Sequence, residues 1–176
     1  KGRTSTCGSS RCRPCNVGME KIINVLNTEA LDDYICEICP RGKISAQGDT
    51  CGDCPAGFYT DSQQESRCKS CDPGTYLSET GAISIASCRS CELGTYSVAK
   101  GATSEDACIK CPPGRWSDTV KATLRTDCKP CAIDSFSAEE GRNTSCAECP
   151  DEATTKTEGQ TICLECKAGS YMEKSD

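Results

Sequence analysis

The sequence predicts a small disulfide-rich protein, an elongated tandem array of short β-hairpins with little regular secondary structure and no single core. The first reason is the cysteine content, 19 among 176 residues, which is typical of disulfide scaffolds. The second is a shortage of core material, because only 5% of the residues are aromatic and cysteine supplies much of the 36% that are hydrophobic. The third is a repeated phrase built around pairs of cysteines. Together they indicate that covalent bonds replace the burial of a common core.

The cysteines come in Cys-x-x-Cys pairs that recur with a period near 20 residues, kept strictly from Cys68 to Cys88, Cys108 and Cys128. Self-similarity at such a period is typical of a repeat array. The nine pairs are Cys12–Cys15, Cys36–Cys39, Cys51–Cys54, Cys68–Cys71, Cys88–Cys91, Cys108–Cys111, Cys128–Cys131, Cys146–Cys149 and Cys163–Cys166, with Cys7 left over.

The second cysteine of most pairs opens the same short phrase. A glycine stands three residues on and an aromatic residue five residues on, as in Cys71, Gly74 and Tyr76. Glycine permits a left-handed backbone or a close backbone approach, the Tyr-Ser or Tyr-Thr step favours extended chain, and a second glycine marks the turn back. The phrase therefore predicts one small hairpin per repeat. Two repeats depart from it: Asp134 replaces the glycine in one, and the repeat after Cys149 has neither residue at the marked places.

We expect sequential pairing, in which each Cys-x-x-Cys ends one hairpin and begins the next, because these cysteines occupy the two ends of each hairpin. The rival is an interleaved one-to-three, two-to-four pattern. In the chain-entropy model a disulfide closing a loop of this size contributes about 3 kcal/mol. The expected pairs are Cys7–Cys12, Cys15–Cys36, Cys39–Cys51, Cys54–Cys68, Cys71–Cys88, Cys91–Cys108, Cys111–Cys128, Cys131–Cys146 and Cys149–Cys163. Cys166 is then unpaired and opens a further phrase without its closing cysteine, so we expect its partner to lie further along a longer polypeptide, the alternative being another copy of the chain.

The segment from Met19 to Tyr34 leaves two interpretations open. Ile22, Ile23 and Leu26 have partly helical spacing, which would suit a short helical turn. The span from Cys15 to Cys36 is close to the common period, which favours a variant hairpin.

Zinc is the competing use of the cysteines, since two Cys-x-x-Cys pairs 15–20 residues apart are a recognised zinc pattern. A zinc-binding scaffold is disfavoured for three reasons. The pairs form a continuous ladder of odd number, the sequence has no histidine, and the Gly-x-aromatic phrase has no role in holding a metal. We therefore expect no cofactor.

Other function classes find little support. Without histidine the commonest acid–base group is missing, so we do not expect an enzyme. A net charge of −6 and a pI near 4.8 disfavour a nucleic-acid partner. No apolar run in this segment is long enough to span a membrane. The tripeptide Asn143-Thr144-Ser145 is an N-glycosylation acceptor motif, which makes Asn143 the expected glycosylation site.

The segments CPAGFYTDSQQESRCKSC, CDPGTYLSETGAISIASCRSC and CPPGRWSDTVKATLRTDCKPC resemble the ephrin-receptor-like cysteine-rich repeat. They are also similar to the cysteine-rich modules of tumour-necrosis-factor receptors and to EGF-like domains. The resemblance runs from about Cys36 to Tyr171 and implies an extracellular, disulfide-stacked ectodomain. We accordingly divide the chain into a divergent N-terminal cysteine-rich repeat (residues 1–35), tandem ephrin-receptor-like repeats (36–166) and the start of a further repeat (167–176).

For function, the first hypothesis is an extracellular structural repeat protein that forms a rod, a stalk or a subunit of a surface or matrix filament. Repeats that carry the same glycine and aromatic marks leave few local departures for a ligand site. The alternative is the ligand-binding ectodomain of a cell-surface receptor. In either case the chain would be secreted or displayed at the cell surface. Its partners would be other protein chains, including copies of itself, with glycans also possible.

Overall fold

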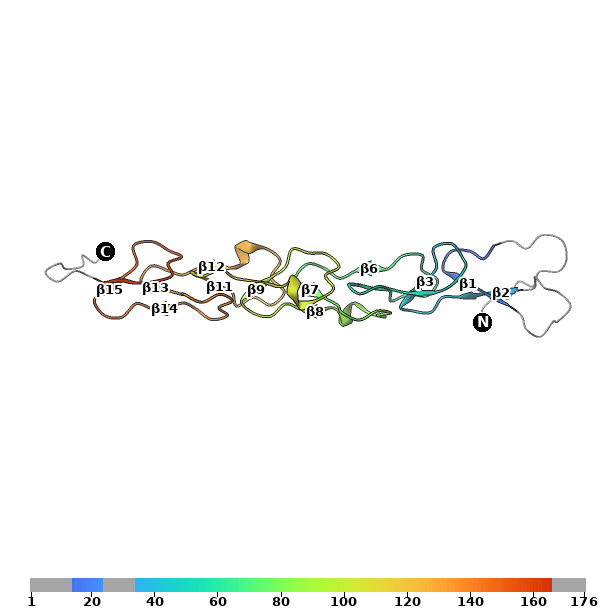
Figure 1. Ribbon diagram of the computed structural model, residues 1–176, viewed down its shortest axis with the longest axis horizontal. Helices are drawn as coiled ribbons and strands as arrows, with labels where there is room; N and C mark the ends of the chain where they lie inside the picture. Colours follow the sequence, from blue (N-terminus) through green and yellow to red (C-terminus); the bar gives the residue numbers. More distant parts are fainter. Residues whose placement is uncertain (1–13, 24–33, 166–176) are drawn as a thin grey trace. The chain divides into compact units, whose positions relative to one another are not determined.

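The computed structural model describes residues 14–23 and 34–165 (Figure 1). In this part of the chain the secondary structure consists of eight antiparallel two-stranded hairpins and three short 3₁₀ helices. The strands are β1 (Met19–Ile23), β2 (Tyr34–Ile38), β3 (Lys43–Ile44), β4 (Gly52–Asp53), β5 (Phe58–Tyr59), β6 (Lys69–Ser70), β7 (Thr75–Tyr76), β8 (Arg89–Ser90), β9 (Thr95–Tyr96), β10 (Ile109–Lys110), β11 (Arg115–Trp116), β12 (Lys129–Pro130), β13 (Ser135–Phe136), β14 (Ala147–Glu148), β15 (Ala153–Thr154) and β16 (Leu164–Glu165). This confirms the predicted tandem array of short hairpins.

The first described repeat is a hairpin as well. Strand β1 pairs antiparallel with β2, with Lys21 opposite Cys36 and Ile23 opposite Tyr34. The two ends of this segment, Met19–Ile23 and Tyr34–Ile38, thus pair as a hairpin, and the helical turn considered for the residues between them falls outside the described residues. Residues 24–33, which connect the two strands, lie outside the described residues.

The repeat closed by Cys111 and Cys128 shows how the phrase folds. Gly114 has a φ of +77°, which an L-residue with a side chain rarely adopts. The turn around it is closed by the amide of Arg115, which donates to the carbonyl of Pro112 over 3.1 Å. The chain then enters β11, where Trp116 lies opposite Lys129 of β12. The glycine thus turns the chain from the cysteine into the first strand.

Three consecutive repeats carry a short 3₁₀ helix before their closing cysteine. The helices are η1 (Ile85–Ser87), η2 (Glu105–Ala107) and η3 (Arg125–Asp127). The Asp127 carboxylate caps η3 by accepting from the amides of Thr123 (2.8 Å) and Leu124 (3.0 Å). In each of these repeats the disulfide spans 17 residues. The next repeat spans only 15 and has no such helix.

Consecutive repeats are joined through their backbones. The amide of Gly57 donates to the carbonyl of Leu77 in the next repeat (2.8 Å), and that of Gly94 donates in the same way to Ser117 (2.9 Å). The aromatic position adds a parallel bridge to the following repeat, as between Trp116 and Arg142. Each repeat therefore supplies hydrogen-bond partners that an isolated two-stranded hairpin lacks.

The marked glycines also contact the next repeat but one. A Cβ added to Gly57 would lie 2.1 Å from the carbonyl oxygen of Gly101, and one added to Gly114 would lie 2.1 Å from that of Gly159. No side chain fits at such a distance. Both reasons for glycine that the sequence suggested, a positive φ and a close backbone approach, therefore apply at the same position.

Burial is spread along the array and does not form a single core. The cysteines are largely buried, and so is the residue that follows the aromatic position or its equivalent, which is at most 3% exposed in the seven repeats from Cys39 to Cys163. These residues are Ser45, Thr60, Leu77, Ser97, Ser117, Ser137 and Thr155. Most are small because the backbones of adjacent repeats meet there. At Leu77 the side chain joins a local cluster with Tyr59, Cys71 and Cys88.

By its contacts the chain divides into two compact units. One holds Lys1–Asp72, Tyr76–Arg89 and Lys100–Ser104, and the other holds Pro73–Thr75, Ser90–Ala99 and Glu105–Asp176. Each contact between repeats given above lies within one unit. The boundary falls inside repeats rather than between them, since Pro73–Thr75 belongs to the second unit and Lys100–Ser104 to the first.

Candidate functional site

The disulfides are the residues that the sequence singled out first. Eight of the nine expected pairs are present, with Cα–Cα distances from 5.5 to 5.8 Å. They are Cys15–Cys36, Cys39–Cys51, Cys54–Cys68, Cys71–Cys88, Cys91–Cys108, Cys111–Cys128, Cys131–Cys146 and Cys149–Cys163. The ninth pair, Cys7–Cys12, and the odd Cys166 lie outside the described residues.

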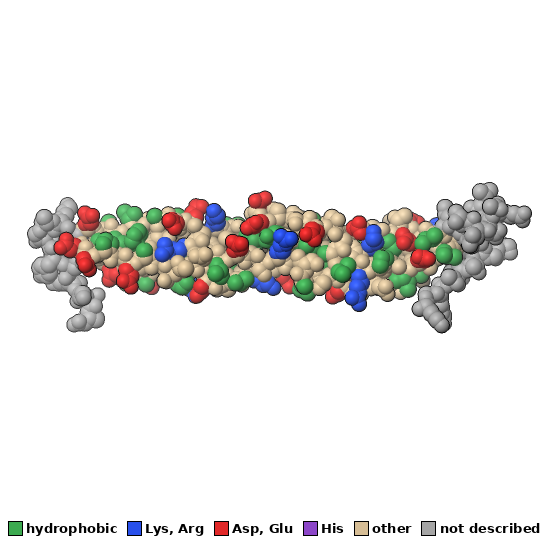
Figure 2. Space-filling model, turned by 90° about the horizontal axis from the view of Figure 1, so that it is seen from below, with side chains coloured by type: hydrophobic (Ala, Val, Ile, Leu, Met, Phe, Trp, Pro, Cys, Tyr) green, Lys and Arg blue, Asp and Glu red, His purple; other side chains and the backbone are tan. Residues whose placement is uncertain are grey.

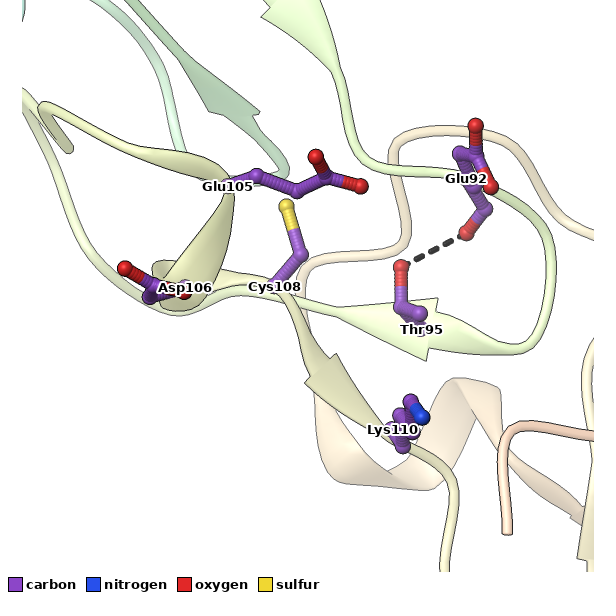
Figure 3. Close-up of a pocket in the computed structure, with 6 residues that line it drawn as sticks. All are labelled: Glu92, Thr95, Glu105, Asp106, Cys108 and Lys110. Carbon is purple, nitrogen blue, oxygen red and sulfur yellow. Dashed lines mark hydrogen bonds between the residues drawn. The ribbon is translucent and has the colours of Figure 1, made fainter. Parts of the chain in front are cut away.

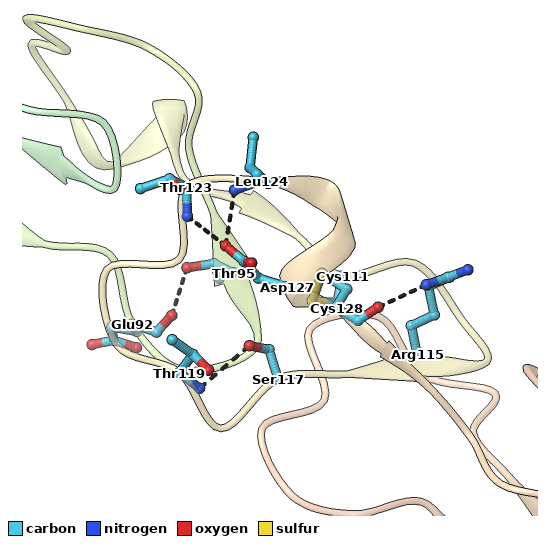
Figure 4. Close-up of a disulfide and its surroundings, with 10 residues drawn as sticks. All are labelled: Glu92, Thr95, Cys111, Arg115, Ser117, Thr119, Thr123, Leu124, Asp127 and Cys128. Carbon is cyan, nitrogen blue, oxygen red and sulfur yellow. Dashed lines mark hydrogen bonds between the residues drawn. A yellow bond between two sulfur atoms is a disulfide. The ribbon is translucent and has the colours of Figure 1, made fainter.

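Figure 4 shows how polar groups surround the Cys111–Cys128 disulfide. The Arg115 guanidinium donates from Nη1 to the carbonyl of Cys128 over 2.7 Å. Both cysteines are 0% exposed. The disulfide is thus enclosed by the turn and strands that it closes, and the side chains around it secure the two ends of the same hairpin.

Four of the described hairpins carry an ion pair, and in two of them the pair is formed by an aspartate and a lysine beside the aromatic residue. In one, Lys69 lies opposite Tyr59 and its ammonium is 2.6 Å from the Asp61 carboxylate. The hydrogen bond from Lys69 lowers the pKa of Asp61 below its ordinary value, and the same bond raises the pKa of Lys69. Both side chains are exposed to solvent, so this ion pair contributes little to the stability of the hairpin.

The second such hairpin repeats the arrangement with Trp116. Lys129 lies 4.8 Å from the centroid of the Trp116 ring and 2.7 Å from the Asp118 carboxylate. The hydrogen bond from Lys129 holds the pKa of Asp118 below its ordinary value. The lysine that follows the closing cysteine therefore has two partners, a ring and a carboxylate.

The repeat closed by Cys91 and Cys108 departs from this pattern. Ile109 stands where the lysine would be, opposite Tyr96, and Val98 stands where the carboxylate would be. Their side chains remain exposed, Val98 at 61% and Ile109 at 49%. An apolar pair thus replaces the ion pair on this hairpin.

The same repeat has a shallow hollow of about 440 Å³ (Figure 3). The lining residues are Glu92, Thr95, Glu105, Asp106, Cys108 and Lys110. Three of them are carboxylates and one is an ammonium, so the hollow carries net negative charge at neutral pH. The hydroxyl of Thr95 donates to the backbone carbonyl of Glu92 over 2.7 Å, which fixes the turn at one side. The hollow is suited to a positively charged side chain of a partner rather than to a buried small molecule.

Apart from Cys108, the sequence alone did not single out these lining residues. Glu105 and Asp106 come into the hollow through η2, and Glu92 comes from the turn at the start of the repeat. A weak signal was nevertheless present, because aligning the repeats places Val98 and Ile109 where two other hairpins have Asp and Lys, although the Cys131–Cys146 repeat also lacks this pair.

The cysteines and carboxylates of the described residues were the candidates for metal binding or thiol chemistry. Every described cysteine is in a disulfide, so none presents a thiolate. Within residues 14–23 and 34–165, no group of three His, Cys, Asp or Glu side chains lies close enough to hold a metal ion. Asn143, the expected glycosylation site, is exposed.

A chain of hairpins that are each closed by a disulfide, and that dock without a shared core, is a disulfide-rich tandem-repeat protein. The model of the family described as tyrosine-protein kinase ephrin type A/B receptor-like matches residues 42–88, 85–128 and 126–162. These matches cover more than half of the sequence, and the chain belongs to this ephrin-receptor-like family. No curated protein matches the chain.

The family sets the general class of the protein. Its repeats are typically non-catalytic extracellular modules, and ephrin-receptor-like domains bind other proteins. The repeats and the many disulfides point to an extracellular or cell-surface domain, because disulfides form and persist in oxidising compartments. In the part of the chain that the structure describes, no helix has the length and apolar character needed to cross a bilayer.

Proposed function

We propose that the chain is an extracellular structural repeat segment, serving as a rod, a stalk or a subunit of a surface or matrix filament. The observation that supports this most is the recurrence of one contact. At Gly57, Gly94 and Gly114 alike, a glycine lies against the backbone of the next repeat but one. Because each repeat presents the same backbone surface, repeats can be added without redesigning a core. A segment of this kind sets a distance through its number of repeats.

The surface supports the same function. On the face seen in Figure 2, acidic and basic side chains are interspersed and hydrophobic ones occur in small separate groups. Such a mixed surface is typical of a soluble extended repeat segment. The partners that we propose are other protein chains, including copies of this one, and the segment has no catalytic role of its own.

The test is a deletion of one complete 20-residue period, residues 91–110. The deletion joins Ser90 to Cys111 and keeps a Cys-x-x-Cys phrase from Cys88 to Cys111. The shortened chain should retain its remaining disulfides, and its maximum dimension in small-angle X-ray scattering should fall by the rise of one repeat. A shortened chain that unfolds, or that keeps the original dimension, would contradict a length-setting role. Negative-stain images of the native material then separate a filament from single chains.

A second candidate function is ligand binding by a receptor ectodomain, and the Cys91–Cys108 repeat favours it. The exposed Val98 and Ile109 and the acidic hollow are on the same repeat. The partner that fits is a protein segment with lysine or arginine beside apolar side chains.

Peptide display can test this second function. Random peptides selected on the wild-type chain should be rich in basic and apolar residues and should fail to bind a Val98→Asp/Ile109→Lys variant. This variant places at the two positions the residue types that Asp61 and Lys69 provide in another repeat, so the hairpin is expected to remain folded. Peptides that bind both chains equally would exclude the Cys91–Cys108 repeat as the binding site.

A further inference from the structure

The single Asn-x-Ser/Thr tripeptide of the sequence lies on the returning half of the Cys131–Cys146 hairpin. Asn143, Thr144 and Ser145 are all exposed. Asn143 has no hydrogen-bond partner among the described residues, and its side-chain amide is therefore available for modification. The motif alone is common by chance, so glycosylation is inferred from the place of Asn143 in the repeat.

The position of Asn143 is exposed in most of the described repeats. It is the second residue after the second glycine of the hairpin, Gly141. The equivalent residues Ile83, Thr103 and Thr161 are exposed in their own repeats, and Thr123 is half-buried. Because Asn143 itself is exposed, a large group on its side-chain nitrogen can extend into solvent.

The backbone on both sides of Asn143 is fixed. The carbonyl of Arg142 accepts from the amide of Ser117 in the preceding repeat over 3.0 Å, and Nε of Arg142 donates to the carbonyl of Ser145 over 2.9 Å. The three preceding repeats have a 3₁₀ helix at the corresponding place, with η3 capped by Asp127. The shorter loop of this repeat has no helix, so the acceptor tripeptide lies in irregular chain between two anchored points.

We propose that Asn143 carries an asparagine-linked oligosaccharide. The donor is an oligosaccharide on a lipid pyrophosphate, encountered in the oxidising secretory compartment that the disulfides also require. A bond forms between Nδ2 of Asn143 and the anomeric carbon of the sugar, and the bond from that carbon to the pyrophosphate oxygen breaks. The lipid pyrophosphate leaves and the amide loses one proton. The modification is independent of the proposed structural role, and either can fail without the other.

The experiment is peptide mass spectrometry on the full chain secreted from eukaryotic cells, before and after treatment with peptide-N-glycosidase F. The peptide that contains Asn143 should carry a glycan mass before treatment and aspartate at position 143 after it. Asn16, which is exposed but not followed by an acceptor motif, should remain unmodified and serves as the internal control.

Two variants sharpen the result. Asn143→Gln removes the acceptor amide, and Ser145→Ala keeps the amide but removes the hydroxyl that the motif requires, so both should lose the glycan and migrate faster on gels. If either variant is not secreted, the wild-type peptide decides alone. An unmodified Asn143 peptide before treatment, with no mass change afterwards, would overturn the proposal.

Discussion

Replacing Gly114 by alanine tests the contact between a repeat and the next repeat but one. The new Cβ would lie 2.1 Å from the carbonyl oxygen of Gly159 and 2.8 Å from its carbon, so one backbone must move. Overpacking of this kind costs about 1–3 kcal/mol. The φ of +77° adds about 1–2 kcal/mol for a residue with a side chain. We therefore expect Gly114→Ala to destabilise local structure by about 2–5 kcal/mol in total.

Gly159→Ala is the matched control for Gly114→Ala. Gly159 has nearly the same φ, +76°, but a Cβ there would meet nothing closer than Cβ of Pro130, at 3.7 Å, which is an ordinary contact. The backbone cost and the effect on the unfolded chain are therefore shared, and only the collision differs.

The assay for both glycine variants is native-state hydrogen exchange with the disulfides intact, followed at the amide of Cys131, which donates to the carbonyl of Gly114. Protection there should fall about 5- to 150-fold further in Gly114→Ala than in Gly159→Ala, corresponding to about 1–3 kcal/mol. Equal losses of protection in the two variants would refute the reasoning, because the close approach would then contribute nothing beyond the glycine φ.

Three further predictions concern other parts of the array. Leu77→Ala should lower the free energy of unfolding by about 2–4 kcal/mol, since Leu77 is 2% exposed, and should speed hydrogen exchange at the amide of Gly57. The control Val98→Ala, at a 61% exposed position, should change the free energy of unfolding by less than about 0.5 kcal/mol. Similar losses of stability in the two variants would contradict a local core at Leu77. Lys129→Met should raise the pKa of Asp118 toward its ordinary value in an NMR titration, with Asp61 as an unaffected reference. Because the folded-state pKa of Asp118 is lowered, the small stability that this ion pair contributes is present above the ordinary carboxyl pKa and is lost as pH falls through the lowered value. An Asp118 titration that is unchanged in Lys129→Met would show that Lys129 does not cause the lowered pKa. Finally, a reducing agent should abolish the folded structure by circular dichroism while EDTA leaves it unchanged, and unfolding by EDTA alone would instead indicate a metal.

Much of the local structure follows from the sequence. The Cys-x-x-Gly-x-aromatic phrase predicts a turn and a short strand after each second cysteine, and Gly114 and Trp116 have these roles. Such features depend on residues a few positions apart, and they repeat, so each repeat supports the interpretation of the next. Even where Asp134 replaces the glycine, the backbone keeps a positive φ of +62°. The turn there is imposed by the disulfide-closed hairpin and the adjacent repeats.

The candidate site could be predicted only in part. The loss of the ion pair at Val98 and Ile109 is visible when the repeats are aligned, but the hollow on the same repeat is not. Its residues come from a turn, two strands and a 3₁₀ helix, and their side chains meet because the disulfide between Cys91 and Cys108 brings the two ends of the loop together.

What the sequence determined by itself is the repeat: the period, the hairpin and the residues at which chain direction changes. What only the tertiary structure decided is how the repeats dock. Nothing in the phrase shows that Ser117 and its equivalents are buried, or that Gly114 contacts Gly159 in the next repeat but one as well as Ser137 in the adjacent repeat. The physical reason is that docking is made largely by backbone atoms, which every residue shares, so the sequence records the contact only as a place where a side chain is not allowed.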